Sequence, residues 1–244
     1  MLAQPATPAE AVRAVDDDIA HGADVIKLFV VSWVARAGKH VPVPMSLAIV
    51  EAATREAHRQ GKLVFAHPST ITGMELVLRG HVDVLAHTTE DPDQWTPSIV
   101  RRLKSANVSL IPTLTLFSGA SSSGLILHEV KHYSDAGGQI LFGTDVGYLT
   151  DYPDLTREYD LLGRAGLTFP QVLATLTTAP ASRLGFAATI GRVAGGKDAD
   201  LVVLQSDPAR ELAAFARIKL TLRRGRVLYR AEGQLSPGLG PANH

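Results

Sequence analysis

Four residues of metal-binding type stand at or near the ends of short apolar segments: Lys27 in DVIKL, His67 in KLVFAH, His87 in VDVLAH and Asp145 in QILFGTD. Imidazole and carboxylate groups bind divalent ions, whereas a lysine ammonium cannot do so unless it is modified. A bound divalent ion activates water for hydrolysis. The four residues therefore predict a hydrolytic metal site, provided that the fold brings the segment ends together.

A second metal-binding pattern, His-x-x-x-His with a Glu after the first His, is formed by His128, Glu129 and His132. On a helix this spacing places both histidines on one face, where they can hold zinc. The apolar residues of the segment fall on nearly the opposite face: Ile126, Val130 and Tyr133. We therefore expect the histidines to face solvent, and a zinc site here is the weaker interpretation. Glu158, a conceivable third ligand, belongs to a later helical segment.

The elements that must position these residues alternate along the chain. Apolar segments predict five strands, at 24–31, 62–67, 82–87, 108–114 and 139–145. Between them, amphipathic segments predict helices at 8–22, 46–61, 72–80 and 96–107, with a further helix around 128–132. Buried strands that alternate with helices form a parallel sheet with helical cover, either a barrel or a doubly wound sheet. In α/β barrels the carboxyl ends of the strands carry the chemistry, which is where the four residues fall.

The character of the chain changes after Gly191. Short segments at 198–205, 217–225 and 226–230 predict strands of a small β appendage. We therefore expect a partial barrel over 1–190, a C-terminal β segment over 191–231 and a tail over 232–244.

Bulk composition excludes several classes of function. Apolar residues make up 45% and charged residues 20% of the 244 residues, which is typical of a globular protein. The 24 basic and 24 acidic side chains cancel, so no basic field for nucleic acid is expected. The chain has no cysteine, which excludes thiolate metal sites. No signal peptide or membrane-length apolar segment is visible, so we expect no membrane partner. The sequence leaves the compartment open, with the cytoplasm favoured.

The segment GRVAGGKD resembles a phosphate-binding loop, with Gly191, Gly196 and Lys197 at the required spacing. Asp198 stands where Ser or Thr would be needed, and its carboxylate would repel phosphate. No strand precedes the segment. We therefore do not expect a nucleotide site.

The sequence as a whole resembles the metal-dependent amidohydrolase superfamily, and within it the imidazolonepropionase-like and Xaa-Pro dipeptidase (prolidase)-like branch. Matching segments follow the order of the family over nearly the whole chain: 22–28, 56–67, 82–90, 110–114, 140–147, 176–185 and 191–204. The last of these, GRVAGGKDADLVVL, is the most specific, because it leads into the β domain that flanks these barrels.

The resemblance implies a (β/α)8 TIM-type barrel that holds one or two divalent metal ions, with zinc as the expected metal. It implies that Lys27 is carboxylated and bridges the metals, and that His67 and His87 bind the second metal. Asp145 would contact the first metal and accept a proton from the attacking water. The implied function is hydrolysis of C–N bonds of amides, cyclic amides or peptide-like small molecules.

The sequence also departs from the family. The His-x-His pair that ends the first barrel strand has no counterpart, and only strands four to eight are matched. We therefore expect a chain that lacks the N-terminal part, with open sheet edges that favour homo-oligomers or a complementary N-terminal segment. The alternative function is a non-catalytic remnant that oligomerises or binds a complementary chain.

Simpler structural roles remain open for each site residue. Lys27 can be an ion-paired strand lysine, His67 and His87 can be hydrogen-bonded core histidines, and Asp145 can cap a turn. Two further residues, His40 and Tyr148, lie in predicted loops on the active face and are weaker candidates for substrate contacts. The loop at 117–124 is expected to shape access to the site.

Overall fold

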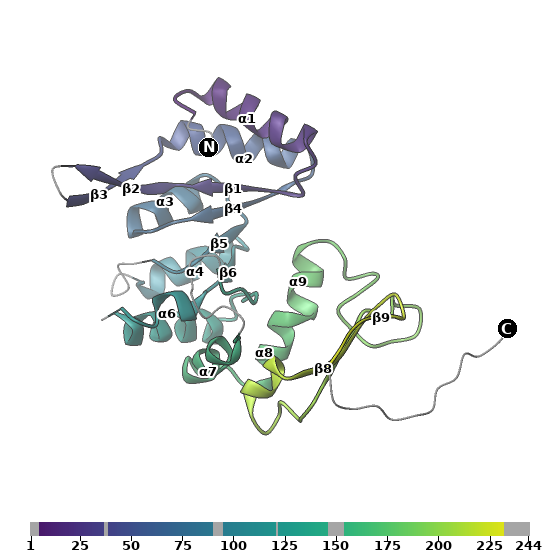
Figure 1. The fold of residues 1–244 in the computed structure, drawn as a ribbon. Coiled ribbons are helices and arrows are strands. Elements are labelled where there is room, and N and C mark those ends of the chain that lie inside the picture. The colour runs from purple at the N-terminus through teal and green to yellow at the C-terminus, as the bar shows by residue number, and fades with distance from the viewer. Residues whose placement is uncertain (1–4, 37–38, 90–94, 121, 146–153, 232–244) are drawn as a thin grey trace.

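The computed structural model describes residues 5–36, 39–89, 95–120, 122–145 and 154–231. They form an α/β fold around a parallel sheet of four strands (Figure 1). The strands are β1 (Val25–Phe29), β4 (Leu63–His67), β5 (Val84–Ala86) and β6 (Ser109–Ile111), in the spatial order β1-β4-β5-β6. The parallel arrangement that the alternating pattern predicts is therefore confirmed, and it brings the carboxyl ends of the strands to one edge.

Helices precede and follow the parallel strands and supply the apolar cover. The first four are α1 (Pro8–Ala20), α2 (Leu47–Arg59), α3 (Ile71–Arg79) and α4 (Pro97–Ser105). Each begins after a Ser or Thr whose side chain accepts a backbone N–H three residues later: Thr7, Ser46, Thr70 and Thr96. Their apolar faces join the sheet in one core, which includes Val15, Val50 and Val64 at 3% exposure or less.

The second half of the chain is mostly helical. It contains α5 (Leu114–Phe117), α6 (Ser123–Asp135), α7 (Thr156–Arg164), α8 (Phe169–Leu176) and α9 (Thr178–Arg183). Tyr159 of α7 stacks on Phe142 with ring centroids 4.8 Å apart, which ties these helices to the segment that ends at Asp145. No helix in the described ranges is both long and apolar enough to cross a membrane.

The predicted strand at 139–145 is only partly formed. Ile140 makes an isolated parallel bridge with Leu110 of β6, and the N–H of Leu141 donates to the Leu110 carbonyl. The next N–H, that of Phe142, donates instead to the carbonyl of Thr175 in α8. The segment therefore leaves the ladder after one bridge, and the prediction of a fifth full strand was wrong.

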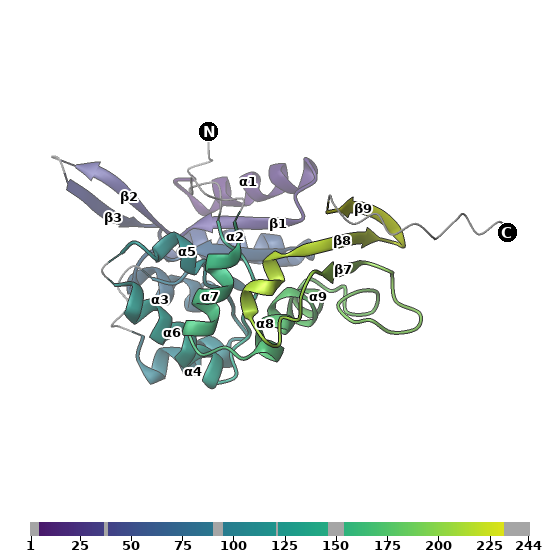
Figure 2. The same cartoon turned by 60° about the horizontal axis from the view of Figure 1, so that its bottom comes forward.

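The segment that was predicted as a loop after β1 is a hairpin. Strands β2 (Val31–Arg36) and β3 (Lys39–Pro44) pair in antiparallel fashion and project beyond the main sheet (Figures 1 and 2). Pro42 and Pro44 of β3 are accommodated because, within the described residues, β3 pairs only with β2 and its other edge is free.

The C-terminal segment forms its own antiparallel sheet, as predicted. Its strands are β7 (Leu201–Leu204), β8 (Ile218–Arg223) and β9 (Arg226–Arg230), with a 3-10 helix, η3 (Leu212–Ala216), before β8. Both views place this sheet beside α8 and α9, away from α3 and α4 (Figures 1 and 2). Phe215 of η3 packs on Tyr159 at 5.5 Å, which anchors the appendage to the helices. The predicted tail at 232–244 lies outside the described residues.

Candidate metal and active site

Three of the four predicted site residues end parallel segments. His67 is the last residue of β4, His87 directly follows β5, and Asp145 closes the segment that bridges to β6. Because the segments run parallel, their ends meet at one edge of the sheet. Lys27 lies in the middle of β1, opposite Phe65 of β4, and therefore lies slightly deeper than the other three.

The structure brings His67, His87 and Asp145 together. The two imidazole rings meet edge to face with centroids 4.9 Å apart, and Nε2 of His87 lies 3.3 Å from Oδ2 of Asp145. Phe29, the partner of His67 in the β1–β4 register, packs on the His67 ring at 5.4 Å.

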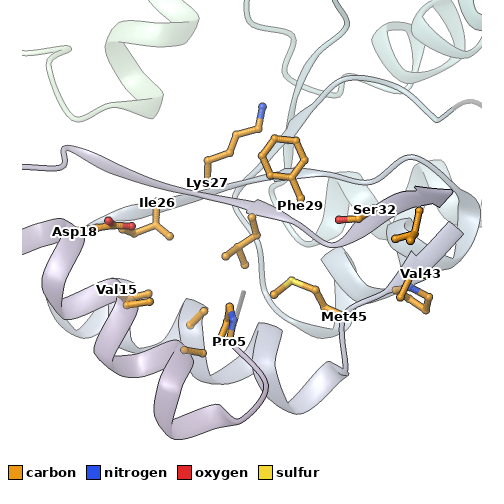
Figure 3. A pocket seen from close by; sticks show the side chains of 15 residues that line it. Pro5, Val15, Asp18, Ile26, Lys27, Phe29, Ser32, Val43 and Met45 are labelled. Carbon is orange, nitrogen blue, oxygen red and sulfur yellow. The ribbon is translucent and has the colours of Figure 1, made fainter. Parts of the chain in front are cut away.

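Lys27 projects from the same side of β1 as Phe29, and its Nζ lies 5.5 Å from the centre of the Phe29 ring (Figure 3). Although the residue is exposed by overall area, partial burial of the ammonium lowers its pKa, and the nearby Asp145 carboxylate opposes that shift. Lys27 and Asp145 are therefore close enough to interact electrostatically.

The environment keeps both histidines neutral. Burial, together with the nearby His67 and the Lys27 charge, lowers the pKa of His87 to about 3. Burial also lowers the pKa of His67, with the Lys27 charge acting in the same direction and Asp145 opposing it. Neutral imidazole is the form that binds metal ions, so these shifts suit ligands.

The donor atoms fit a divalent ion in type. Nδ1 of His67 is buried and has no hydrogen-bond partner within the described residues, which a metal ligand would explain. Nδ1 of His87 is held 2.7 Å from the Thr113 hydroxyl, which leaves Nε2 directed at Asp145. No three His, Asp or Glu side chains of the described ranges come close enough to form a complete site by themselves. A complete site therefore needs a further donor, for which Lys27 is the candidate.

Four of the seven non-glycine residues with positive φ in the described ranges lie at the same edge. Four non-glycine residues that follow or end the parallel segments have positive φ: Ser69 (53°), His87 (97°), Thr113 (49°) and Asp145 (53°). Each such residue costs on the order of 1–3 kcal/mol and persists only where its surroundings enforce it. Strain of this kind gathers at functional sites, so it supports the location of the site independently of residue type.

The two weaker candidates are not placed by the structure. His40 lies in β3, but its side chain is outside the described part, and Tyr148 falls in the segment 146–153, which is also outside it. The predicted access loop at 117–124 is shorter than expected, because Phe117 ends α5 and Ser123 begins α6. Phe117 itself contacts the site, with its ring 6.2 Å from that of His87.

The two histidines of the His-Glu-x-x-His helix lie on its solvent side, as predicted. On α6, His128 is exposed and His132 is half-buried, while Val130 and Tyr133 are buried in the core. The two rings lie 5.4 Å apart, and Glu129 faces the core side of the helix. Glu158 cannot serve them, because its carboxylate accepts hydrogen bonds from Leu114 and Thr115 at the start of α5.

Sequence reasoning missed three contributors to the site. Phe29 was noticed only as a strand residue, Thr113 only as part of the matching segment 110–114, and Glu158 only as a conceivable zinc ligand. Each acts through a contact between segments that are distant in the sequence, and no local sequence pattern predicts such a contact. The only available signal was a polar residue directly after an apolar strand, which Thr113 shares with His87.

Comparison with known proteins shows the family of the chain and relatives of its fold. The sequence model of the amidohydrolase family matches residues 1–228. An amidohydrolase from Hapsidospora irregularis is 38% identical over 80 residues, which are 30% of this chain and 8% of that protein. The imidazolonepropionase of Thermoplasma acidophilum is 32% identical over 105 residues, which are 41% of this chain and 26% of that protein.

Among solved structures, a Xaa-Pro dipeptidase with methionine bound in its active site superimposes with a TM-score of 0.81 at 21% identity. The match covers 93% of this chain and 59% of the dipeptidase, so the chain spans well under two thirds of the proteins that it resembles. At this identity the likeness concerns the fold. Because the family model covers most of its length, the chain belongs to the amidohydrolase family.

Proposed function

We propose that the protein is a metal-dependent hydrolase of C–N bonds in amides, cyclic amides or peptide-like small molecules. One observation carries the proposal: two neutral imidazoles and a carboxylate meet at the strand ends of a chain that belongs to the amidohydrolase family. A dipeptidase that cleaves Xaa-Pro dipeptides shares the fold, which makes a peptide-like C–N bond the first substrate class to test.

The ligands in this proposal are Nδ1 of His67, Nε2 of His87, the Asp145 carboxylate and a carboxylated Lys27. When bound, a divalent ion, with zinc as the first choice, would lower the pKa of water at the site and polarise the scissile carbonyl. The lowered pKa of Lys27 favours the neutral amine, the form that adds to carbon dioxide to give a carbamate and a proton. Carbamate formation would thus replace the cationic ammonium of Lys27 by anionic oxygens that can bind the metal.

The residues of the chain divide the remaining work. Asp145 accepts the proton of the attacking water and later delivers it to the leaving nitrogen, as a general base and then a general acid. Nε2 of His87 lies 3.3 Å from Oδ2 of Asp145, so the proposed ligand atoms of the two residues are adjacent. Phe29 lines the same side of the sheet as Lys27 and offers an apolar surface for substrate (Figure 3). A partial (β/α)8 barrel built from strands four to eight is the architecture that fits this arrangement.

The test is turnover of dipeptides and cyclic amides by the 244-residue chain after incubation with zinc. Asp145→Asn removes the proton acceptor and should lower kcat by about 100-fold or more. Asp135→Asn is the matched control, because Asp135 pairs with Lys131 on the surface of α6 and should leave turnover unchanged. Absence of both zinc uptake and turnover in the unchanged chain would refute the proposal.

A second candidate function, association without catalysis, is favoured by one observation. Within the described residues, β1 pairs only with β4, and a cavity of about 430 Å³ lies between this open edge, α1 and β2–β3 (Figure 3). Its lining is mostly apolar and includes Val15, Val43 and Met45. An unpaired strand beside apolar surface favours pairing with another chain. We propose that a second copy of the chain occupies this edge, because two copies with a net charge of zero have no net electrostatic repulsion.

A further inference from the structure

Thr113 makes a buried contact with the histidine at the centre of the site. Its Oγ1 lies 2.7 Å from Nδ1 of His87, and the two residues are only 2% and 3% exposed. A hydroxyl can donate or accept a hydrogen bond, so it pairs with the imidazole in either tautomer. When His87 gives its Nε2 lone pair to a ligand, Nδ1 must carry the proton and donate to Thr113.

The surroundings of the His87 ring leave it little freedom. His67 and Phe117 both meet it edge to face at 76°, with centroids 4.9 and 6.2 Å away. With Nδ1 held by Thr113, Nε2 can face only the Asp145 side, at 3.3 Å from Oδ2. Thr113 therefore determines which ring nitrogen faces the proposed metal.

Thr113 itself is held in an unfavourable conformation. Its φ of 49° is left-handed, which is strongly disfavoured for a β-branched residue. Such a conformation persists only if neighbouring interactions enforce it. The interactions must act on the residues that follow, because Thr113 immediately precedes α5.

Glu158 supplies them from α7. Its Oε1 accepts the N–H of Leu114 at 2.8 Å, and its Oε2 accepts the N–H and the hydroxyl of Thr115 at 2.7 and 2.6 Å. The side chain is 1% exposed, so the carboxylate is shielded from water and is hydrogen-bonded to these three donors instead. A buried carboxylate is costly unless it is paired in this way, and here all its donors belong to the two residues after Thr113.

We propose that Thr113 is a positioning residue that aims Nε2 of His87 at the metal, and that Glu158 holds Thr113 in place through the start of α5. The inference rests on the proposed metal site. It adds a relay, which we define as the series of contacts from Glu158 of α7 to Leu114 and Thr115, and from the adjacent Thr113 to the proposed ligand His87.

The first experiment measures zinc affinity of the full chain by competition with a chelator. Thr113→Val keeps the β-branched shape and removes the hydroxyl, and it should weaken zinc binding by about 10- to 100-fold. Thr113→Ser retains the hydroxyl and should bind zinc nearly as the unchanged chain does. Thr54→Val is the matched control, because it removes a buried hydroxyl from α2. Unchanged affinity in Thr113→Val, or an equal loss in Thr113→Ser, overturns the proposal.

The second experiment needs no metal. Ring nitrogen NMR shifts of His87, assigned by comparison with His87→Gln, should show a hydrogen-bonded Nδ1 in the metal-free chain and in Thr113→Ser, and an Nδ1 without that hydrogen bond in Thr113→Val. An unchanged Nδ1 shift in Thr113→Val, or the shift of a free Nδ1 in the unchanged chain, overturns the role of Thr113. If the unchanged chain takes up no zinc, the proposed function fails and this measurement alone decides the inference.

Glu158→Gln tests the outer part of the relay. An amide offers one acceptor oxygen and brings an NH2 group against N–H donors, so the start of α5 should loosen. Zinc affinity should fall in the same direction as in Thr113→Val but by less, and the Nδ1 shift of His87 should move part of the way toward its value in Thr113→Val. If Glu158→Gln lowers thermal stability while zinc affinity and His87 shifts stay unchanged, Glu158 only caps α5, and its part of the proposal is wrong.

Discussion

At the scale of single residues, burial controls the chemistry of the site. His87 and His67 are ordinary histidines by sequence, yet burial and the Lys27 charge keep both neutral. The same environment favours the neutral amine of Lys27. Because both histidines are neutral and the amine of Lys27 is shifted toward its neutral form, the cluster repels a cation less. In the metal-free protein, the same buried neutral histidines make the fold sensitive to acid.

The metal-free chain should lose stability as the pH falls. The pKa of His87 is about 3 in the folded chain against 6.5 in the unfolded one, so between these values only the unfolded chain binds the proton. Unfolding free energy should therefore fall as the pH drops below 6.5, and the His87 share between pH 7 and pH 5 is about 2 kcal/mol. Urea unfolding at both pH values should show a smaller fall for His87→Gln, and an equal fall would contradict the assignment.

At the scale of elements, the turns after the strands position the candidate ligands. Between β4 and α3, the Thr70 N–H donates to the Pro68 carbonyl at 2.6 Å, and the Thr70 hydroxyl accepts the Gly73 N–H at 3.3 Å. Gly73 approaches Pro68 so closely that a Cβ there would lie 1.9 Å from the Pro68 oxygen. This tight turn directly follows His67 and fixes the end of its strand.

Gly73→Ala should destabilise the chain by about 1–3 kcal/mol, because the Pro68 backbone must move to admit the methyl group. Gly124→Ala in α6 is the matched control. Its new Cβ meets nothing within 4 Å, so helix propensity should stabilise the chain by about 0.5 kcal/mol. Thermal unfolding of the two variants should shift in opposite directions. Equal shifts would show that the close approach in the Pro68 turn is unimportant.

At the scale of the whole molecule, the edge of β1 that faces away from β4 is an unpaired sheet edge within the described ranges. Phe29, Val34 and Val41 are 36–39% exposed there, close to the apolar cavity. The parallel sheet is open at β1, while at β6 it continues through the bridge to Ile140. A sheet left in this form exposes backbone groups and apolar side chains together, which favours association.

Sedimentation velocity over a range of concentrations should therefore show self-association of the chain. Ala14→Glu places a charge in the cavity at the open edge and should weaken association. Ala9→Glu, at an exposed position in the first turn of the same helix, adds the same charge outside the cavity and should leave association unchanged. A monomer at all concentrations would contradict the proposal, and equal effects of both variants would place the contact elsewhere.

Sequence alone predicted the repeating units of the fold and most of the ligand candidates. Alternation of apolar and amphipathic segments identified β1, β4, β5 and β6 with their helices. These features are local, since propensity and periodicity act within a few turns of chain. The hairpin β2–β3 was missed, because the segment that contains His40 was predicted as a loop. The strand at 139–145 was overstated because Thr175, thirty-three residues later, takes the N–H of Phe142.

What the sequence by itself determined is the absence of thiolate, the presence of N and O donor side chains at predicted strand ends, and membership of the amidohydrolase family. Only the tertiary structure decided which nitrogen of each histidine faces the site, that Glu158 supports α5 and does not serve the histidines of α6, and that an apolar cavity borders the open β1 edge. The reason is physical: burial, tautomer selection and hydrogen bonding to Leu114 and Thr115 arise from contacts between segments far apart in the chain. Such contacts leave no periodic or compositional trace in either segment.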